Sequence, residues 1–209
     1  MGTEAFSAEN LASGRARLLI VPGLHNSPSG HWQSWLEQLF PGAVRVTQRD
    51  WARAELDRWA GRIASVLDRA GPGPWLAVGH SFGALAIARH LALEADSPLA
   101  AALLVAPADP DRFGAAEDLP QQILPVPTTL LLSANDPWMP LAAGQRWAHR
   151  WGSPCVNLGP AGHINVQSGH ATLPYARQWV LAHSQRLARA ATAAAALTAT
   201  AAAAANHAA

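Results

Sequence analysis

A serine lies between two glycines near the middle of the chain, in the segment Gly79-x-Ser81-x-Gly83. A short apolar run, 75–78, precedes this segment, and a helix-forming stretch, 84–93, follows it. A strand, a tight turn and a helix in this order form a nucleophile elbow, which exposes a serine hydroxyl at a helix N-terminus. The pattern therefore indicates nucleophilic attack by Ser81 on a carbonyl carbon. A glycine-rich turn that happens to hold a serine is the alternative, and the rest of the chain has to decide between them.

Two residues that follow the serine are suited to activate it. A serine hydroxyl is a weak nucleophile at neutral pH, so it needs a histidine base that a carboxylate orients. Asp136 comes just after the predicted strand 128–133, and His163 follows the last predicted strand, 155–158, in a glycine-containing loop. Because ligands of such sheets bind beyond the carboxyl ends of the strands, both side chains are expected beside Ser81. The order serine, acid, histidine is that of the α/β-hydrolases.

Both partners have rivals in the sequence. Asp136 lies in an Asn-Asp-Pro segment, which is also an ordinary turn sequence, and Asp109 and Asp111 follow the preceding predicted strand. Asp136 is preferred because it follows the next-to-last strand. His163 is preferred because it alone directly follows the final strand; its rivals within predicted helices are expected at the surface. The rival histidines are His25, His31, His80, His90, His149, His170 and His183, of which His90, His149 and His183 are the helical ones.

Backbone amides near Ser81 are expected to stabilise the oxyanion that forms when the serine attacks. The amide of Phe82, at the start of the predicted helix, is one candidate. The second is the amide of Leu24, in the loop after the first predicted strand, where Gly23 lets the backbone approach the substrate. His25 follows in the same loop and is a candidate for substrate contact; bracing of neighbouring loops is its alternative role.

Nine tryptophans are distributed along the chain. Most lie inside predicted helices or strands, where packing in the core explains them. Trp51 and Trp138 differ, because each follows a predicted strand at the edge of the sheet where the site is expected. These two are the candidates for lining an apolar acyl or aryl pocket, and packing beneath the loops is the alternative.

Short apolar runs alternate with longer amphipathic ones, as in a parallel sheet with helices on both faces. The sequence therefore predicts an α/β fold, a compact three-layer sandwich with a mostly parallel sheet of about six strands. Only about twenty residues join the fourth and fifth strands, too few for a helical lid domain, so an open site is expected. The predicted strands are 17–21, 43–47, 75–78, 101–106, 128–133 and 155–158, and the predicted helices are 31–39, 55–69, 81–93, 141–151 and 173–188.

The length of 209 residues suits one domain with one core. This domain is expected over 16–188, after an N-terminal tail, 1–15, and before an alanine-rich low-complexity tail, 189–209, that could extend the final helix or fray. The single cysteine, Cys155, lies in a predicted strand and is expected to be a buried thiol.

Several classes of function are poorly supported by the composition. The 15 Lys and Arg residues against 14 Asp and Glu residues leave a formal net charge of +1, so no nucleic-acid partner is expected. No H-E-x-x-H or paired Cys/His spacing indicates a metal, and no cofactor is expected. The N-terminus lacks the features of a signal peptide, so a cytoplasmic protein without a membrane partner is expected. The expected partner is a small-molecule acyl substrate; the sequence leaves the oligomeric state open.

Eight segments carry a resemblance to a known family: Val21-Pro-Gly-Leu-His-Asn26 with Gly30-His-Trp-Gln33, Gln48-Arg-Asp-Trp51, Val78-Gly-His-Ser-Phe-Gly83, Leu104-Val-Ala-Pro-Ala-Asp109, Ser133-Ala-Asn-Asp-Pro137, and Gly159-Pro-Ala-Gly-His-Ile-Asn165 with Ser168-Gly-His170. Together they resemble the small serine hydrolases typified by retinoblastoma-binding protein nine and its bacterial relatives, a lidless branch of the α/β-hydrolases. The resemblance covers residues 18 to about 174. It implies Ser81 as the nucleophile, His163 as the base, and Asp136 rather than Asp109 as the orienting acid.

Three functions are compatible with these residues. The leading hypothesis is an esterase-like serine hydrolase that cleaves a small ester, thioester or activated amide through an acyl-enzyme on Ser81. The second is an aminopeptidase-like hydrolase of short peptides, in which Asp50 or Asp109 would bind the free amine. The third is a binding protein on the same fold, because a fold alone does not establish function. The intact set of serine, acid and histidine argues against this third reading.

Overall fold

Six strands form one open sheet in the computed structural model, which describes residues 16–207 and the side chains of residues 16–198. The strand order is β2-β1-β3-β4-β5-β6, and every neighbouring pair is parallel. All six carboxyl ends therefore lie at one edge of the sheet, where loops of an α/β sheet form binding sites. The strands are β1 (Arg17–Val21), β2 (Val44–Arg45), β3 (Trp75–His80), β4 (Leu99–Val105), β5 (Thr128–Leu132) and β6 (Cys155–Asn157).

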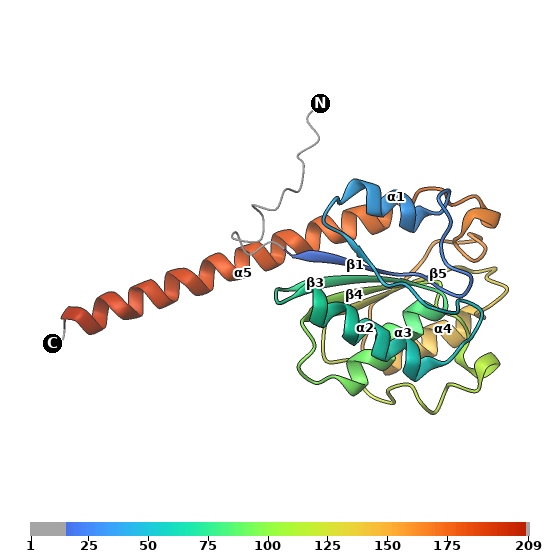
Figure 1. Cartoon of the computed structure of the whole chain (residues 1–209), viewed down its shortest axis with the longest axis horizontal. Coiled ribbons are helices and arrows are strands. Elements are labelled where there is room, and N and C mark those ends of the chain that lie inside the picture. Colours follow the sequence, from blue (N-terminus) through green and yellow to red (C-terminus); the bar gives the residue numbers. More distant parts are fainter. Residues whose placement is uncertain (1–15, 208–209) are drawn as a thin grey trace.

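Helices cover both faces of the sheet, which gives the three layers visible in Figure 1. Successive side chains of a strand point to opposite faces. Accordingly, Leu19 and Val21 of β1 pack with α2, α3 and α4, whereas Leu18 and Ile20 pack with α1 and α5. The helices are α1 (Trp32–Leu39), α2 (Leu56–Ala70), α3 (Phe82–Leu93), α4 (Leu141–Arg150) and α5 (Pro174–His207).

The observed elements confirm the predicted α/β fold with its parallel sheet and helices on both faces. Between Val105 and Thr128 the only helix is a short 3₁₀ turn, η2 (Pro110–Phe113), so no helical lid domain covers this part of the sheet edge. β2 is shorter than its predicted range, although the amide of Val46 still donates to the Ile20 carbonyl at 2.8 Å.

The last helix is much longer than predicted. α5 does not end at Ala188 but continues to His207, and Figure 1 shows it projecting well beyond the sheet. Alanine has the highest helix propensity, so the low-complexity segment continues a helix that the folded domain has already nucleated. Within residues 16–207 no helix has both the length and the hydropathy that a membrane crossing requires.

Two expectations about burial are wrong. Cys155 is exposed, because β6 lies at the edge of the sheet and has a strand on one side only. His90 is buried, because α3 packs between the sheet and its neighbouring helices and is covered almost all round. The His90 Nε2 atom lies 2.8 Å from the Ser97 hydroxyl, which satisfies this ring nitrogen.

The burial of His90 predicts how stability depends on pH. Burial is the main cause that lowers the pKa of His90 from 6.5 to about 4. The unfolded chain therefore binds a proton below pH 6.5 that the folded chain does not bind until about pH 4. The free energy of unfolding is expected to fall across this range as the pH decreases. Urea denaturation at pH 7 and pH 5 measures this fall. The free energy of unfolding should fall by about 1–2 kcal/mol more for wild type than for His90→Gln.

His149→Gln is the matched control for this measurement, because His149 is exposed near the end of α4. Between pH 7 and pH 5, the free energy of unfolding of His149→Gln should fall by as much as that of the wild type. An equal loss in His90→Gln would contradict the prediction.

Candidate active site

Ser81 lies in a strained turn between β3 and α3, as the elbow motif predicts. Its φ of 53° and ψ of −124° fall in a region that residues with a side chain rarely adopt. The turn also requires Gly83, because a Cβ atom there would lie 2.3 Å from the Pro22 carbonyl oxygen and 2.4 Å from that of Val21. The strained turn places the Ser81 hydroxyl at the carboxyl edge of the sheet, beside the first turn of α3.

The structure brings the three residues of the predicted triad together. The Nε2 atom of His163 lies 2.9 Å from the Ser81 Oγ atom. The Nδ1 atom of His163 lies 2.9 and 3.0 Å from the two carboxylate oxygens of Asp136. A carboxylate only accepts hydrogen bonds, so Nδ1 carries the proton and Nε2 is free to accept the serine proton. The Asp136 side chain is only 2% exposed, which strengthens its interaction with the imidazole.

The rival acid has a different role. Asp109 accepts the amide of Asp111 at 3.2 Å and caps η2 at its N-terminus. Its own amide donates to the Trp138 carbonyl at 2.9 Å, so it links the loops after β4 and β5. The geometry thus joins Asp136, and not Asp109, to the imidazole of His163.

Two further residues tie the loop of Asp136 to the loop of His163. The Asn135 side-chain oxygen accepts the amide of Gly162 at 2.7 Å, and the Ser133 hydroxyl accepts the amide of Ala161 at 3.0 Å. Ser133 also donates to Asn135 at 3.0 Å. In the sequence both residues belong to the segment 133–137, and the segment alone predicts no role for them. Their polar side chains at the carboxyl end of a buried strand were the available signal.

Two backbone amides are available for an oxyanion. Phe82 begins α3, so its amide has no acceptor within the helix. The amide of Leu24 has no hydrogen-bond acceptor within residues 16–207, although the next amide, of His25, donates to the Trp51 carbonyl at 3.0 Å. The loop of Leu24 comes very close to the nucleophile, because a Cβ atom on Gly23 would lie 2.8 Å from the Ser81 Cβ atom.

Two polar residues hold this loop in place, Gln33, which is buried, and Arg45, which is half-buried. The Gln33 amide nitrogen donates to the carbonyls of Val21 and Val78, and its oxygen accepts the Ser27 hydroxyl at 2.6 Å. The Arg45 guanidinium donates to Ser27, as well as to Asn26, Ser34 and Glu37. His25 and Asn26 have φ values of 63° and 64°, so these contacts restrain a backbone that would otherwise relax.

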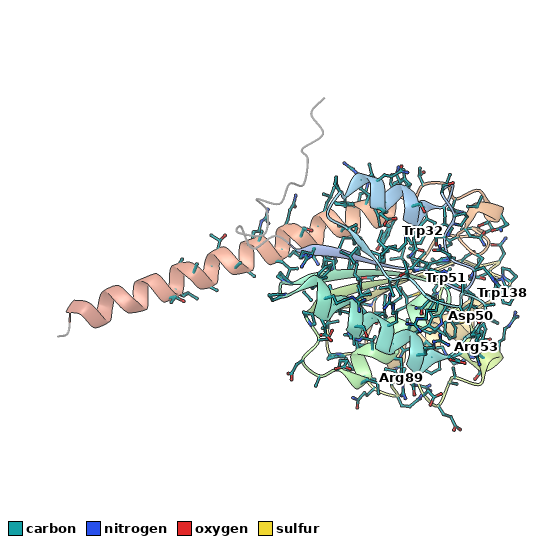
Figure 2. The ribbon with its side chains drawn as sticks, in the orientation of Figure 1. Trp32, Asp50, Trp51, Arg53, Arg89 and Trp138 are labelled. Atoms are coloured by element: carbon teal, nitrogen blue, oxygen red, sulfur yellow. The ribbon has the colours of Figure 1, made fainter. Side chains whose placement is uncertain are left out.

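The three candidate substrate contacts lie in different surroundings. Trp138 is 47% exposed, and its ring centre lies 6.3 Å from that of His163. The Arg112 guanidinium lies over the Trp138 ring, 5.5 Å from the ring centre. Trp51 is half-buried and packs edge-on against Trp59 at 5.8 Å. His25 is exposed. Figure 2 shows Trp51 and Trp138 at the end of the molecule opposite the projecting part of α5.

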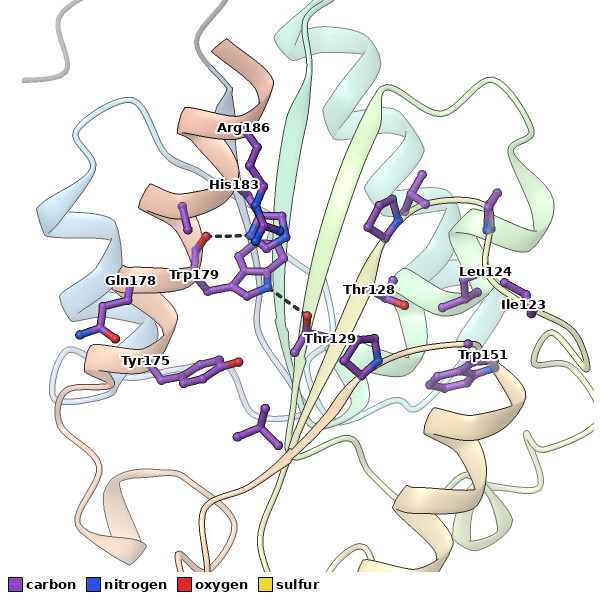
Figure 3. A pocket seen from close by; sticks show the side chains of 17 residues that line it. Ile123, Leu124, Thr128, Thr129, Trp151, Tyr175, Gln178, Trp179, His183 and Arg186 are labelled. Atoms are coloured by element: carbon purple, nitrogen blue, oxygen red, sulfur yellow. Dashed lines mark hydrogen bonds between the residues drawn. The ribbon is translucent and has the colours of Figure 1, made fainter. Parts of the chain in front are cut away.

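A separate groove of about 680 Å³ lies at the amino-terminal end of β5 (Figure 3). Ser81 lies at the other end of the strands, where their carboxyl ends meet. The lining of the groove includes Trp151, Trp179 and Arg186 but none of the candidate site residues. Within the part of the chain that the structure describes, no three His, Cys, Asp or Glu side chains are grouped to hold a metal ion.

Comparison with known proteins gives one family and a set of solved structures. A family model described as serine hydrolase matches residues 18–183. Comparison with the curated proteins gives no match. A YdeN-like hydrolase from Pectobacterium atrosepticum is 37% identical, with a TM-score of 0.79 over 86% of this chain and 96% of that one.

More distant structures share the fold alone. The ydeN gene product of Bacillus subtilis is 19% identical, with a TM-score of 0.67 over 82% of this chain and 99% of that one. The esterase RhEst1 from a Rhodococcus species is 17% identical, with a TM-score of 0.58 over 84% of this chain and 91% of that one. At these identities the likeness establishes the α/β-hydrolase architecture and nothing about substrate.

Proposed function

The chain belongs to the serine hydrolase family, and on this premise we propose that it cleaves a small ester, thioester or activated amide through an acyl-enzyme on Ser81. The observation that carries the proposal is the hydrogen-bonded order of Ser81, His163 and Asp136, with distances of 2.9 and 2.9 Å. A binding protein would have no need for a serine held in a strained turn, so the same observation argues against a scaffold role.

Acylation begins when the Ser81 hydroxyl gives its proton to Nε2 of His163 and its oxygen attacks the substrate carbonyl carbon. Asp136 stabilises the imidazolium that forms, because its carboxylate accepts the Nδ1 proton. The amides of Leu24 and Phe82 donate hydrogen bonds to the negatively charged substrate oxygen. The imidazolium then gives its proton to the departing oxygen, sulfur or nitrogen atom as the bond from that atom to the carbonyl carbon breaks, and the alcohol, thiol or amine leaves. Deacylation repeats these steps with water as the nucleophile, and Ser81 regains its proton from His163 when the acid leaves.

The oxyanion assignment is tested at Gly23. Gly23→Ala places a methyl group 2.8 Å from the Ser81 Cβ atom and 3.0 Å from the His80 carbonyl oxygen. The loop must then move away and take the Leu24 amide with it. Loss of one oxyanion donor lowers kcat by about 10²–10³-fold, and a loss of at least about 10²-fold is expected here. The measurement is steady-state hydrolysis of p-nitrophenyl acetate.

Gly30→Ala is the matched control, because a Cβ atom at Gly30 meets nothing within 4 Å. It lies in the same connection between β1 and α1 and should retain wild-type kcat. A Gly23→Ala enzyme as active as Gly30→Ala would rule out the Leu24 amide as an oxyanion donor.

Short acyl groups are the substrates that the site favours. No helical lid domain lies between β4 and β5 to enclose a long chain, and Trp138 offers an exposed apolar surface beside His163. Across p-nitrophenyl esters from acetate to dodecanoate, kcat/KM is expected to be highest for short acyl chains, of about two to four carbons, because a single exposed indole offers only a small apolar surface. A steady rise toward dodecanoate would contradict a small-acyl site.

Among the side chains of residues 16–198, no contact in the site favours the aminopeptidase alternative. The two carboxylates that could bind a free amine accept backbone amides of their own turns, Asp50 from Ala52 at 3.0 Å and Asp109 from Asp111 at 3.2 Å. Aminoacyl p-nitroanilides should therefore be cleaved more slowly than the short p-nitrophenyl esters. Faster cleavage of the anilides would favour the aminopeptidase.

A further inference from the structure

Two buried side chains bind the backbone of the loop that carries His163. The Nε2 atom of His80 lies 2.9 Å from the carbonyl oxygen of His163, and the indole nitrogen of Trp32 donates to the next carbonyl, of Ile164, at 2.7 Å. His80 is 6% exposed and Trp32 is fully buried. Two successive carbonyls of one loop are thus held by side chains from β3 and from the first turn of α1.

The His80 contact has a defined proton arrangement. A carbonyl oxygen only accepts, so Nε2 of His80 must carry the proton. Burial is the main cause that lowers the pKa of His80 well below 6.5, so the ring is neutral at physiological pH. A neutral His80 also adds no positive charge beside His163, whose ring centre lies 4.9 Å away. His31 also packs edge-on against His80, with ring centres 4.9 Å apart, which restricts rotation of the ring.

The loop needs such restraint because its backbone is strained. Ile164 has a φ of 48°, and a β-branched side chain in the left-handed region is a conformational outlier. Strain of this kind persists only where neighbouring groups hold it in place. The two hydrogen bonds flank the strained residue, since they take the carbonyl before it and its own carbonyl.

The position of His80 in the chain links the base to the nucleophile. His80 directly precedes Ser81, on a strand that pairs with β1 on one side and β4 on the other. The group that holds the backbone of His163 is therefore attached to the same peptide segment as the attacking oxygen. Asp136 fixes the imidazole ring from a separate loop, so the base is fixed both through its ring and through its backbone.

We propose that His80 is a positioning residue, whose Nε2–H donor holds the His163 backbone so that the imidazole meets Ser81 in line for proton transfer. Trp32 supports the same loop through its indole N–H. This inference rests on the proposed function, since it concerns the geometry of that reaction. Misplacement of a reacting group by about 1 Å lowers the rate by about 10²-fold, and an effect of that size is expected when the donor is lost.

The test uses two amide variants that differ in reach. The side-chain nitrogen of His80→Gln extends about as far as Nε2 of the histidine, whereas that of His80→Asn is shorter by one methylene and falls short of the carbonyl. The readouts are kcat and KM for p-nitrophenyl acetate, the rate of labelling by a fluorophosphonate probe, and the thermal unfolding midpoint. His80→Gln should retain both rates within about 10-fold, and His80→Asn should lose about 10²-fold in kcat and in labelling with little change in KM.

The outcomes separate positioning from a merely structural role. Both variants are polar and buried, so equal losses in both, or equal retention in both, would overturn the proposal. Trp32→Phe keeps an aromatic ring and removes the second donor. The loss in the His80→Asn, Trp32→Phe double variant should differ from the product of the single losses, because both donors act on one loop. If the loss in the double variant equalled the product of the two single losses, the two donors would act independently, which would contradict their joint action on the loop. A wild-type protein that does not react with the probe would instead overturn the proposed function.

Discussion

Ser81→Ala is expected to abolish labelling by a fluorophosphonate probe and to lower kcat for p-nitrophenyl acetate by at least about 10⁴-fold. The probe forms a bond to an activated serine oxygen, and Ser81 Oγ is the oxygen that lies 2.9 Å from the His163 Nε2 atom. Removing this oxygen leaves the base without a nucleophile to activate. Activity that remains would come from the oxyanion amides and substrate binding alone. The measurement is gel detection of a fluorescent fluorophosphonate, together with steady-state kinetics.

Ser65→Ala is the control for this variant. Ser65 is exposed on α2, where its hydroxyl donates to the Gly61 carbonyl at 2.9 Å, and its loss should leave labelling intact. Labelling of Ser81→Ala at wild-type strength would end the proposal that Ser81 is the nucleophile. Because alanine is smaller than serine and tolerates the same backbone, a loss of labelling with an unchanged unfolding midpoint would be attributable to the missing hydroxyl.

The sheet and the three triad candidates were predictable because each depends on local sequence. The apolar run before Ser81 and the glycines around it specify a strand and a tight turn without reference to the rest of the chain. Asp136 and His163 each follow a strand, and parallel strands bring their carboxyl ends together in any open α/β sheet. Their hydrogen-bonded geometry matches this expectation. Their catalytic roles stay predictions until the variants are measured.

The supporting contacts were not predictable, because they join positions far apart in the sequence. Nothing local indicates that the indole of Trp32 would bind the carbonyl of Ile164, or that Arg45 would hold the loop of Asn26. The order of strands in the sheet is equally non-local, and only that order shows that Cys155 lies on an exposed edge. His90 is a different case, since the apolar residues all round α3 were a visible sign of a buried helix.

Asp136→Asn is expected to lower kcat by about 10⁴-fold while the fold is retained, because asparagine has nearly the same shape as aspartate. In the wild type the carboxylate accepts the Nδ1 proton of His163 at 2.9 and 3.0 Å and also the amide of Trp138 at 2.8 Å. The Trp138 amide continues to need an acceptor, so the asparagine oxygen is expected to turn toward it and its NH₂ group toward Nδ1. Nδ1 would then accept, the proton would move to Nε2, and His163 could no longer take the proton of Ser81. The measurement is kcat for p-nitrophenyl acetate.

The discriminating comparison is Asp109→Asn, the same chemical change at the rival acid. Asp109 caps η2 through the amide of Asp111, which an asparagine oxygen can also accept, so this variant should keep kcat within about 3-fold of wild type. The pH dependence of the residual rate offers a second test of the Asp136→Asn variant. Hydroxide can replace the missing base in acyl transfer, so the residual rate of Asp136→Asn should rise steadily with pH above neutrality. If Asp109→Asn lowered kcat more than Asp136→Asn, the orienting acid would be Asp109, which follows the preceding strand, and not Asp136.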